Sequence, residues 1–164
     1  MANQSFETKP FDTQKSVRKA TENRQEYNIV SKDGQKYFWY NKMDRLEMIR
    51  KGIPYQAIEV ISNKLNRPIK FMLGMMGIPQ TTYNKKKKDQ DLLDARDSEL
   101  IALITELLSY GLEVFNEEEE KFQRWLNKPN RSLGGNIPIS LLDTSTGISE
   151  VRYSLNRIEH GNLA

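Results

Sequence analysis

The chain has 164 residues, of which 37% are hydrophobic and 29% charged, enough for one domain of ordinary size or two small ones. It contains no cysteine and one histidine, which excludes a disulfide framework, a thiol nucleophile and a cysteine-rich zinc site. No apolar run approaches the length of a membrane span and the first residues lack a signal-peptide core, so we expect a cytoplasmic protein with no membrane contact.

The net charge of +3 is unevenly distributed along the chain. Residues 42–91 contain 11 basic and 5 acidic side chains, whereas residues 92–128 contain 4 basic and 9 acidic ones. A basic block followed by an acidic block predicts that one region faces a polyanion and that the other does not.

Residues 1–41 are predicted to form an N-terminal extension. The polar composition of residues 1–25 cannot bury enough surface to offset the entropy of ordering, which predicts a loose arm, either solvated or touching DNA. In residues 26–41, Asp33 and Gly34 separate two β-prone runs, which predicts a small β-hairpin. Its consecutive aromatic side chains either stack on bases or anchor the hairpin to a core, and we favour the anchor.

Residues 42–94 are predicted to form a helix-turn-helix region. Asn41 is suited to cap a first helix that has Met43 on its inner side and ends at Gly52. Pro54 is expected to open a second helix, which the proline at position 68 terminates.

A glycine turn within this region separates an apolar helix from a polar one. Gly77, Ile78 and Pro79 predict a tight turn with a buried isoleucine, and the following helix has the position of a recognition helix. Glutamine and asparagine suit adenine, threonine suits bases or phosphates, and lysines position a helix on phosphates. A merely solvated lysine face is the alternative. The candidate DNA-binding residues are Gln80, Thr81, Thr82, Tyr83, Asn84, Lys85, Lys86, Lys87 and Lys88.

Residues 95–164 are predicted to contain a central core helix followed by a small C-terminal module. Asp97 or Ser98 is expected to cap the core helix, and Glu99, Glu106 and Glu113 are expected to form an exposed stripe along it. The glutamates at 117–120 are expected to open the next helix. They point in different directions around it and therefore do not predict a metal site.

Strongly specified turns and caps mark the C-terminal module. A proline-asparagine turn, a glycine pair and Pro138 lead to several candidate N-cap residues at 143–146. A helix with an apolar stripe follows, and His160 and Gly161 close it. A helix so well capped near a chain end is expected to pack either on its own core or on a partner. The stripe consists of Ile148, Val151, Leu155 and Ile158.

This module resembles the C-terminal signature of Xre/MbcA/ParS-type antitoxins. The similarity extends over about residues 68–164 and is strongest after residue 125. The matching residues are Leu133, Gly134, Gly135, Pro138, Leu141, Leu142, Asp143, Thr144, Gly147, Val151, Leu155, Arg157, Ile158, Glu159, His160 and Gly161.

The resemblance implies an all-α fold with a helix-turn-helix domain and a small helical toxin-binding module. It also implies a type II antitoxin that covers the active site of a RES-domain toxin, which consumes NAD⁺, and that represses its own operon. The implied partners are the RES-domain toxin, operator DNA and a second copy of the chain within the complex. The implied toxin-binding residues are Leu141, Arg152, Leu155, Asn156, Arg157, Ile158, Glu159, His160 and Gly161. Whether Arg157 enters the toxin pocket or makes an internal salt bridge stays open.

Two features depart from the family pattern, and two other functions stay open. The N-terminal extension has no counterpart, and lysines stand where arginines are expected in the basic run. We expect no enzyme activity and no cofactor, because His160 in a final helical turn is poorly placed for a general base. The alternatives are a stand-alone helix-turn-helix repressor without a toxin and an interaction protein that has lost DNA binding.

Overall fold

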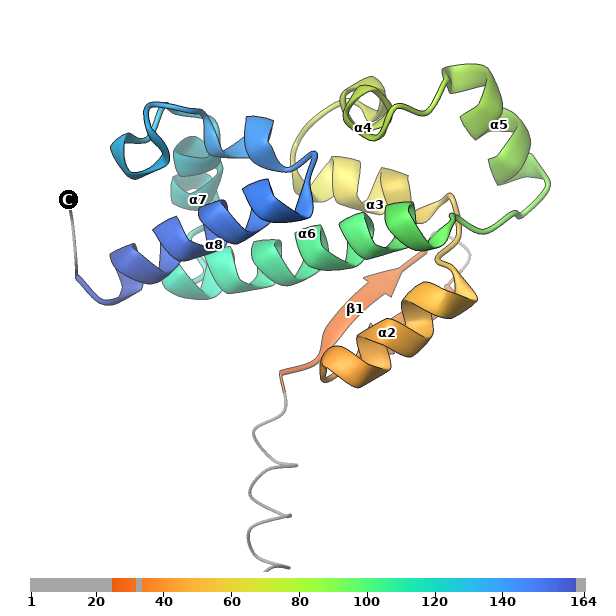
Figure 1. Ribbon diagram of the computed structural model, residues 1–164, viewed down its shortest axis with the longest axis horizontal. Helices are drawn as coiled ribbons and strands as arrows, with labels where there is room; N and C mark the ends of the chain where they lie inside the picture. Colours follow the sequence, from red (N-terminus) through yellow and green to blue (C-terminus); the bar gives the residue numbers. More distant parts are fainter. Residues whose placement is uncertain (1–24, 32–33, 162–164) are drawn as a thin grey trace, which may run out of the picture.

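The computed structural model of the chain describes residues 25–31 and 34–161. The predicted loose arm, apart from Gln25, lies outside these residues. In chain order the elements are β1 (Tyr27–Val30), β2 (Lys36–Trp39), α2 (Lys42–Lys51), α3 (Ala57–Lys64), α4 (Ile69–Met76), α5 (Gln80–Lys88), α6 (Ala95–Val114), α7 (Glu119–Leu126), the 3-10 helices η1 (Arg131–Leu133) and η2 (Pro138–Leu141), and α8 (Ser145–Glu159) (Figure 1). The sequence predicts an all-α fold with a possible N-terminal hairpin, and this order confirms it as mostly helical with a small two-stranded hairpin. No helix in the described ranges is long and apolar enough to cross a membrane.

The predicted hairpin is present and packs on the helical body. Its strands pair antiparallel with Tyr27 opposite Trp39, while Asp33 of the predicted turn lies outside the described residues. Ile29 and Trp39 are completely buried, so one face of the hairpin belongs to the core. The predicted anchoring role is therefore confirmed for Trp39, whereas Phe38 on the other face is 57% exposed.

Glu106 of α6 links the hairpin to α2. Its carboxylate accepts a hydrogen bond from Trp39 Nε1 at 2.7 Å and pairs with the Arg45 guanidinium at 2.7 Å. The predicted exposed glutamate stripe is wrong at this position, because the side chain of Glu106 is only 17% exposed. Glu99 and Glu113 are exposed as predicted. Helical spacing alone does not reveal that the hairpin covers this side of α6.

The helices α2 and α3 follow the predicted apolar pattern, except near the start of α2. Asn41 caps α2 by accepting a hydrogen bond from the Met43 amide at 2.8 Å, and the helix ends before Gly52. Met43 itself was expected inside but is 66% exposed, and Met48 is buried instead. A residue in the first turn of a short helix extends past the edge of the body on which the helix packs.

Two other helices begin at residues different from those expected. α3 does not begin at Pro54, because this proline forms an isolated β-bridge with Leu92 and the helix starts later. Asp94 caps α6 by accepting a hydrogen bond from the Asp97 amide at 2.8 Å. Asp97 and Ser98, the predicted caps, lie inside the helix and are buried.

The helix-turn-helix is formed by α4 and α5, as predicted. Gly77 ends α4 with a left-handed φ of +71°, and the Ile78 amide donates to the Leu73 carbonyl at 2.9 Å. Ile78 is half-buried rather than buried. Met72 and Met76 of α4 are buried, so α4 packs on the body while α5 projects at one end of the molecule (Figure 1).

α6 is the central element, and it contacts β1, α2, α3, α7 and α8. Ile101, Ala102 and Leu107 are completely buried although helical steps of 100° place them on different sides of the helix. A helix with apolar residues on several sides is buried in a core rather than laid on a surface. α8 runs alongside the half of α6 that is distant from α5 (Figure 1).

α7 packs across α6 where the core helix has a glycine. A Cβ on Gly111 would lie 2.1 Å from the Phe122 ring, so only glycine admits this ring. Phe122 and Leu126 are buried as predicted. The helix begins at Glu119 rather than Glu117, which has a left-handed φ of +61° and belongs to the preceding turn.

The C-terminal module forms with the predicted caps. Pro138 is in the first turn of η2, and Thr144 caps α8 by accepting a hydrogen bond from the Gly147 amide at 3.1 Å. A Cβ on Gly147 would lie 1.9 Å from the Leu141 carbonyl oxygen, so this glycine lets η2 approach α8. Gly161 has a left-handed φ of +69°, as its predicted capping position requires.

We predict that Gly147→Ala destabilises the protein by about 2–3 kcal/mol, because the new methyl group overlaps a backbone carbonyl that cannot rotate away. Gly74→Ala is the matched control: Gly74 lies within α4 with open space around it and should gain about 0.5–1 kcal/mol. Urea unfolding of both variants measures the difference. Equal effects of the two substitutions would contradict the close approach of η2 to α8.

We further predict that Glu106→Ala costs about 2–3 kcal/mol, because it leaves the Trp39 indole and the Arg45 guanidinium without their shared acceptor. Glu99→Ala on the same helix removes an exposed carboxylate and should change stability by less than about 0.5 kcal/mol. Thermal unfolding followed by circular dichroism compares them. A loss at Glu99 as large as that at Glu106 would refute the linking role.

Candidate functional site

The N-terminal end of α5 is open to an anionic ligand. Pro79 occupies the N-cap position and provides no side-chain hydrogen bond to the first turn. The first amides of a helix point outward along its axis and favour negative charge. A phosphate group is therefore a suitable partner for this end of α5.

The side chain of Tyr83 packs α5 against the rest of the domain and does not face solvent. Its side chain is only 3% exposed, and its ring lies 6.4 Å from that of Tyr55. Burial, followed by the charge of Glu59, raises the pKa of the Tyr83 phenol well above its usual value, so the group stays neutral. Tyr83, predicted to contact DNA, lies instead on the inner side of α5, which holds the helix on the rest of the domain.

The four lysines of α5 fall into two pairs with different surroundings. Lys86 Nζ pairs with Asp91 at 2.7 Å, and Lys87 Nζ pairs with Glu59. A hydrogen bond from Lys86 to Asp91 raises the pKa of this lysine. Lys85 and Lys88 are exposed and form no ion pair with any described residue. Within the predicted basic run, Lys85 and Lys88 therefore carry the positive charge that no described acidic side chain neutralises.

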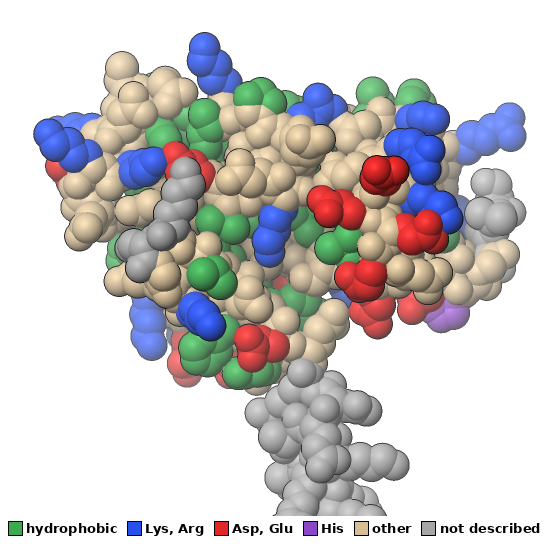
Figure 2. All heavy atoms as spheres, turned by 180° about the vertical axis from the view of Figure 1, so that it is seen from behind, with side chains coloured by type: hydrophobic (Ala, Val, Ile, Leu, Met, Phe, Trp, Pro, Cys, Tyr) green, Lys and Arg blue, Asp and Glu red, His purple; other side chains and the backbone are tan. Residues whose placement is uncertain are grey.

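The polar residues of α5 lie on its outer side. Gln80, Thr81, Thr82 and Asn84 are exposed, and Gln80 Nε2 donates to Asn84 Oδ1 at 3.0 Å. Helical geometry places Thr81, Lys85 and Lys88 opposite Tyr83. Figure 2 shows basic side chains at this end of the molecule, and acidic side chains mixed with basic ones toward the opposite end.

The inner side of α8 belongs to the core of the module. Ile148, Val151 and Leu155 are buried, and Ser154 Oγ lies 2.5 Å from Ser132 Oγ of η1. Leu155, predicted to bind a toxin, is completely buried and cannot reach a partner. Leu141 and Ile158 are half-buried, and Leu141 packs against the core.

A second side of α8 is engaged with Tyr110 of α6. The Arg152 guanidinium lies 4.5 Å from the centre of the Tyr110 ring, and Asn156 Nδ2 lies 3.4 Å from the Tyr110 hydroxyl. That hydroxyl donates a hydrogen bond to Glu159. Three of the residues predicted to bind a toxin therefore face the protein's own core helix.

The remaining side of α8 is free of such contacts. Arg157 is half-buried and forms no ion pair or hydrogen bond with the described part of the chain. His160 Nδ1 lies 2.8 Å from the Asn156 carbonyl oxygen, and Gly161 is exposed. Tyr153 is 63% exposed and was missed in the sequence. Its position opposite the apolar stripe of α8 could have indicated that the Tyr153 side chain is exposed.

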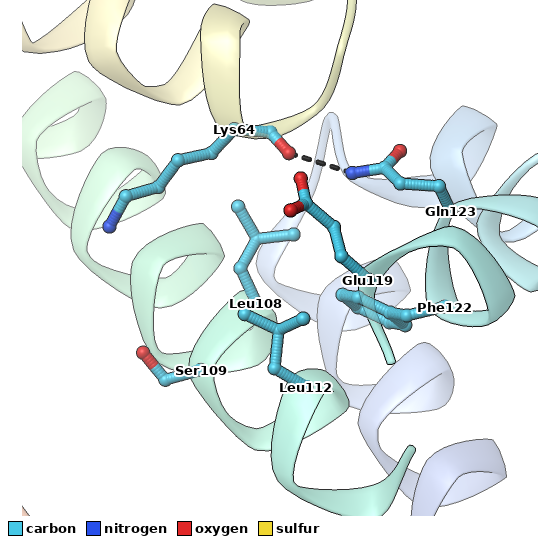
Figure 3. Close-up of a pocket in the computed structure, with 7 residues that line it drawn as sticks. All are labelled: Lys64, Leu108, Ser109, Leu112, Glu119, Phe122 and Gln123. Atoms are coloured by element: carbon cyan, nitrogen blue, oxygen red, sulfur yellow. Dashed lines mark hydrogen bonds between the residues drawn. The ribbon is translucent and has the colours of Figure 1, made fainter. Parts of the chain in front are cut away.

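A cavity of about 230 Å³ lies between α3, α6 and α7 (Figure 3). Gln123 Nε2 donates to the Lys64 carbonyl oxygen at 2.8 Å at its rim. The ammonium of Lys64 and the carboxylate of Glu119 point apart (Figure 3), and burial lowers the pKa of Lys64. Within the described ranges no three His, Cys, Asp or Glu side chains are grouped to hold a metal ion. The polar groups of this cavity therefore do not converge on one point.

Two family models match the chain, and together they cover most of it. Residues 44–105 match the Antitoxin Xre-like helix-turn-helix domain. Residues 111–161 match the Antitoxin Xre/MbcA/ParS C-terminal toxin-binding domain. The hairpin formed by β1 and β2 lies outside both matches.

Curated relatives agree with the family models. "Antitoxin Xre" of Photorhabdus laumondii is 28% identical over 114 residues, which are 70% of this chain and 77% of the relative. "Antitoxin Xre" of Yersinia enterocolitica is 28% identical over 116 residues, 71% of this chain and 78% of the relative. "Prs ADP-ribosylating antitoxin" of a Sphingobium species is 28% identical over 130 residues, 74% of this chain and 82% of the relative. The chain belongs to the Xre/MbcA/ParS family of antitoxins, with a helix-turn-helix domain followed by a C-terminal toxin-binding domain.

Proposed function

We propose that the chain neutralises a RES-domain toxin that consumes NAD⁺ and represses its own operon. In this proposal the C-terminal module covers the active site of the toxin, and α5 binds operator DNA. The observation that carries the proposal is a pre-folded module, matched by a toxin-binding family model, whose last helix keeps one side free. A module that is already ordered loses little conformational entropy on binding, which favours tight coverage of the toxin's active site.

The proposed toxin chemistry has separate support. The name of the Sphingobium relative couples an antitoxin to ADP-ribosylation of Prs. ADP-ribosyl groups are drawn from NAD⁺, so a partner that handles this dinucleotide fits the same chemistry. Arg157 is a suitable residue at the rim of such a site, because the planar guanidinium binds phosphates and carboxylates through paired hydrogen bonds.

The proposed DNA contact uses only the exposed residues of α5. Gln80, Thr81, Thr82 and Asn84 can reach base edges, while Lys85 and Lys88 neutralise phosphates. Helix-turn-helix proteins read paired half-sites as dimers, so two copies of the chain are proposed to bind one operator. α5 and the end of α8 lie at opposite ends of the molecule (Figure 1). The antitoxin can therefore hold DNA and toxin at the same time.

We predict that the full chain stops NAD⁺ loss by the toxin encoded in the neighbouring reading frame, and that the two proteins co-purify. If the module covers the active site, a non-cleavable NAD⁺ analogue must compete with it. At ten times its own Kd the analogue should raise the apparent Kd of the chain about elevenfold.

Titration calorimetry with and without the analogue measures this competition. Simultaneous binding of analogue and chain would contradict coverage of the active site while leaving an antitoxin that inhibits elsewhere. A chain that neither co-purifies with the toxin nor protects NAD⁺ would be a stand-alone repressor or an interaction protein.

We also predict that replacing Lys85 and Lys88 by alanine weakens DNA binding for every sequence and lowers the slope of log K against log salt concentration by about 1.8. The matched control replaces Lys86 and Lys87, which already neutralise Asp91 and Glu59, and should change the slope less. Fluorescence anisotropy across salt concentrations compares the variants. The reverse order of effects would place the phosphate contact on the other side of α5.

A further inference from the structure

Two of the three sides of α8 are used inside the molecule. The inner side buries Ile148, Val151 and Leu155. The adjacent side holds Tyr110 through Arg152 and Glu159. Residues on the inner side are buried and cannot meet a partner, whereas Arg152 and Glu159 are exposed but already engaged with Tyr110.

The third side carries an outer line of residues. Helical steps of 100° place these side chains within about one third of the circumference, opposite the apolar stripe. All of them are exposed except Arg157, which is half-buried. The outer line consists of Thr146, Ser149, Glu150, Tyr153, Arg157 and His160.

Tyr153 is the largest side chain on the outer line, and it has no internal partner. It takes part in no ring pair, cation–π contact or side-chain hydrogen bond with the described residues. Of the exposed large hydrophobic side chains in the described ranges, only Ile137 and Tyr153 lie within residues 111–161. The apolar ring and polar hydroxyl of an exposed tyrosine with no internal partner suit it to a contact surface.

Arg157 lies one turn further along the same line. Residues four apart on a helix are neighbours, so the ring of Tyr153 and the guanidinium of Arg157 present one apolar and one cationic group side by side. Arg152, by contrast, is stacked on Tyr110. The helix thus contains one arginine committed to the fold and one that is available to a partner.

We propose that the outer line of α8 is the toxin contact, with Tyr153 filling an apolar pocket of the toxin and Arg157 pairing with an acidic group beside it. This inference rests on the proposed function, since the occupant is the toxin whose binding the matched family domain describes. Tyrosine and arginine are enriched at the centres of protein interfaces, where a few side chains supply most of the affinity. Each has a large surface and a polar end that needs a partner once it is buried.

The first test measures the affinity of full-length variants for the toxin from the neighbouring reading frame. Tyr153→Ala should raise Kd by about thirtyfold or more, and Arg157→Ala by about tenfold. Two matched controls remove the same residue types elsewhere: Phe38→Ala takes an exposed aromatic from the hairpin, and Arg152→Ala takes the arginine that faces Tyr110. Both controls should keep Kd within about twofold of the unmodified chain.

A second test measures directly whether the toxin covers the outer line, and it does not depend on a loss of affinity. Because the chain has no cysteine, Tyr153→Cys and Ser149→Cys each introduce a unique thiol on the outer line. Toxin binding should slow alkylation of both thiols at least about tenfold, whereas Phe38→Cys, on the hairpin, should react at an unchanged rate. Circular dichroism confirms that each variant is folded.

The outcomes distinguish failure of the outer-line contact from failure of the proposed antitoxin function. If the unmodified chain binds the toxin, but Tyr153→Ala binds equally well and the thiols stay reactive, the outer line is not the contact and the antitoxin function stands. If the unmodified chain does not bind the toxin, the proposed function fails and this inference fails with it. Selective weakening at Tyr153 and Arg157, with protection of both thiols, supports the assignment.

Discussion

The burial of α6 on several sides is the constraint on which the rest of the molecule depends. It packs against α2, α3, β1, α7 and α8, and so joins the elements of both halves of the chain. Residues 44–105 and 111–161 match separate family models, yet one continuous helix runs from the first match into the second. The helix-turn-helix domain and the C-terminal domain are therefore held by a shared core rather than by a linker, because each domain completes the burial of the same helix.

Within both domains, one side of a helix packs against the core and another side faces outward. On α5, buried Tyr83 holds the helix on the domain while Lys85, Lys88 and the exposed polar residues face outward. On α8, Leu155 and Val151 do the same for the outer line that contains Tyr153. An anchored helix presents its outer side chains in a defined orientation, and this preorganisation lowers the entropy lost when a partner binds.

The hairpin adds a second kind of support. Trp39 enters the core, and its indole shares Glu106 with Arg45 of α2. This polar contact is largely shielded from water, so each donor would lose its partner if the hairpin left. The hairpin lies outside both family models, so this support for the helical body comes from residues that neither model covers.

Local patterns in the sequence determined the helices, the hairpin, the helix-turn-helix and the capped C-terminal module, because turns, caps and apolar spacing act over a few residues. The same patterns did not determine which polar residues were free. Tyr83, Glu106 and Arg152 read as surface residues, yet Tyr83 is buried and the other two are engaged by partners distant in the chain. Only tertiary packing brings Trp39 to Glu106 and Tyr110 to Arg152. It also decided that Tyr110 engages the side of α8 with Arg152 while Tyr153 stays exposed, since no helical period records which polar side another element will contact.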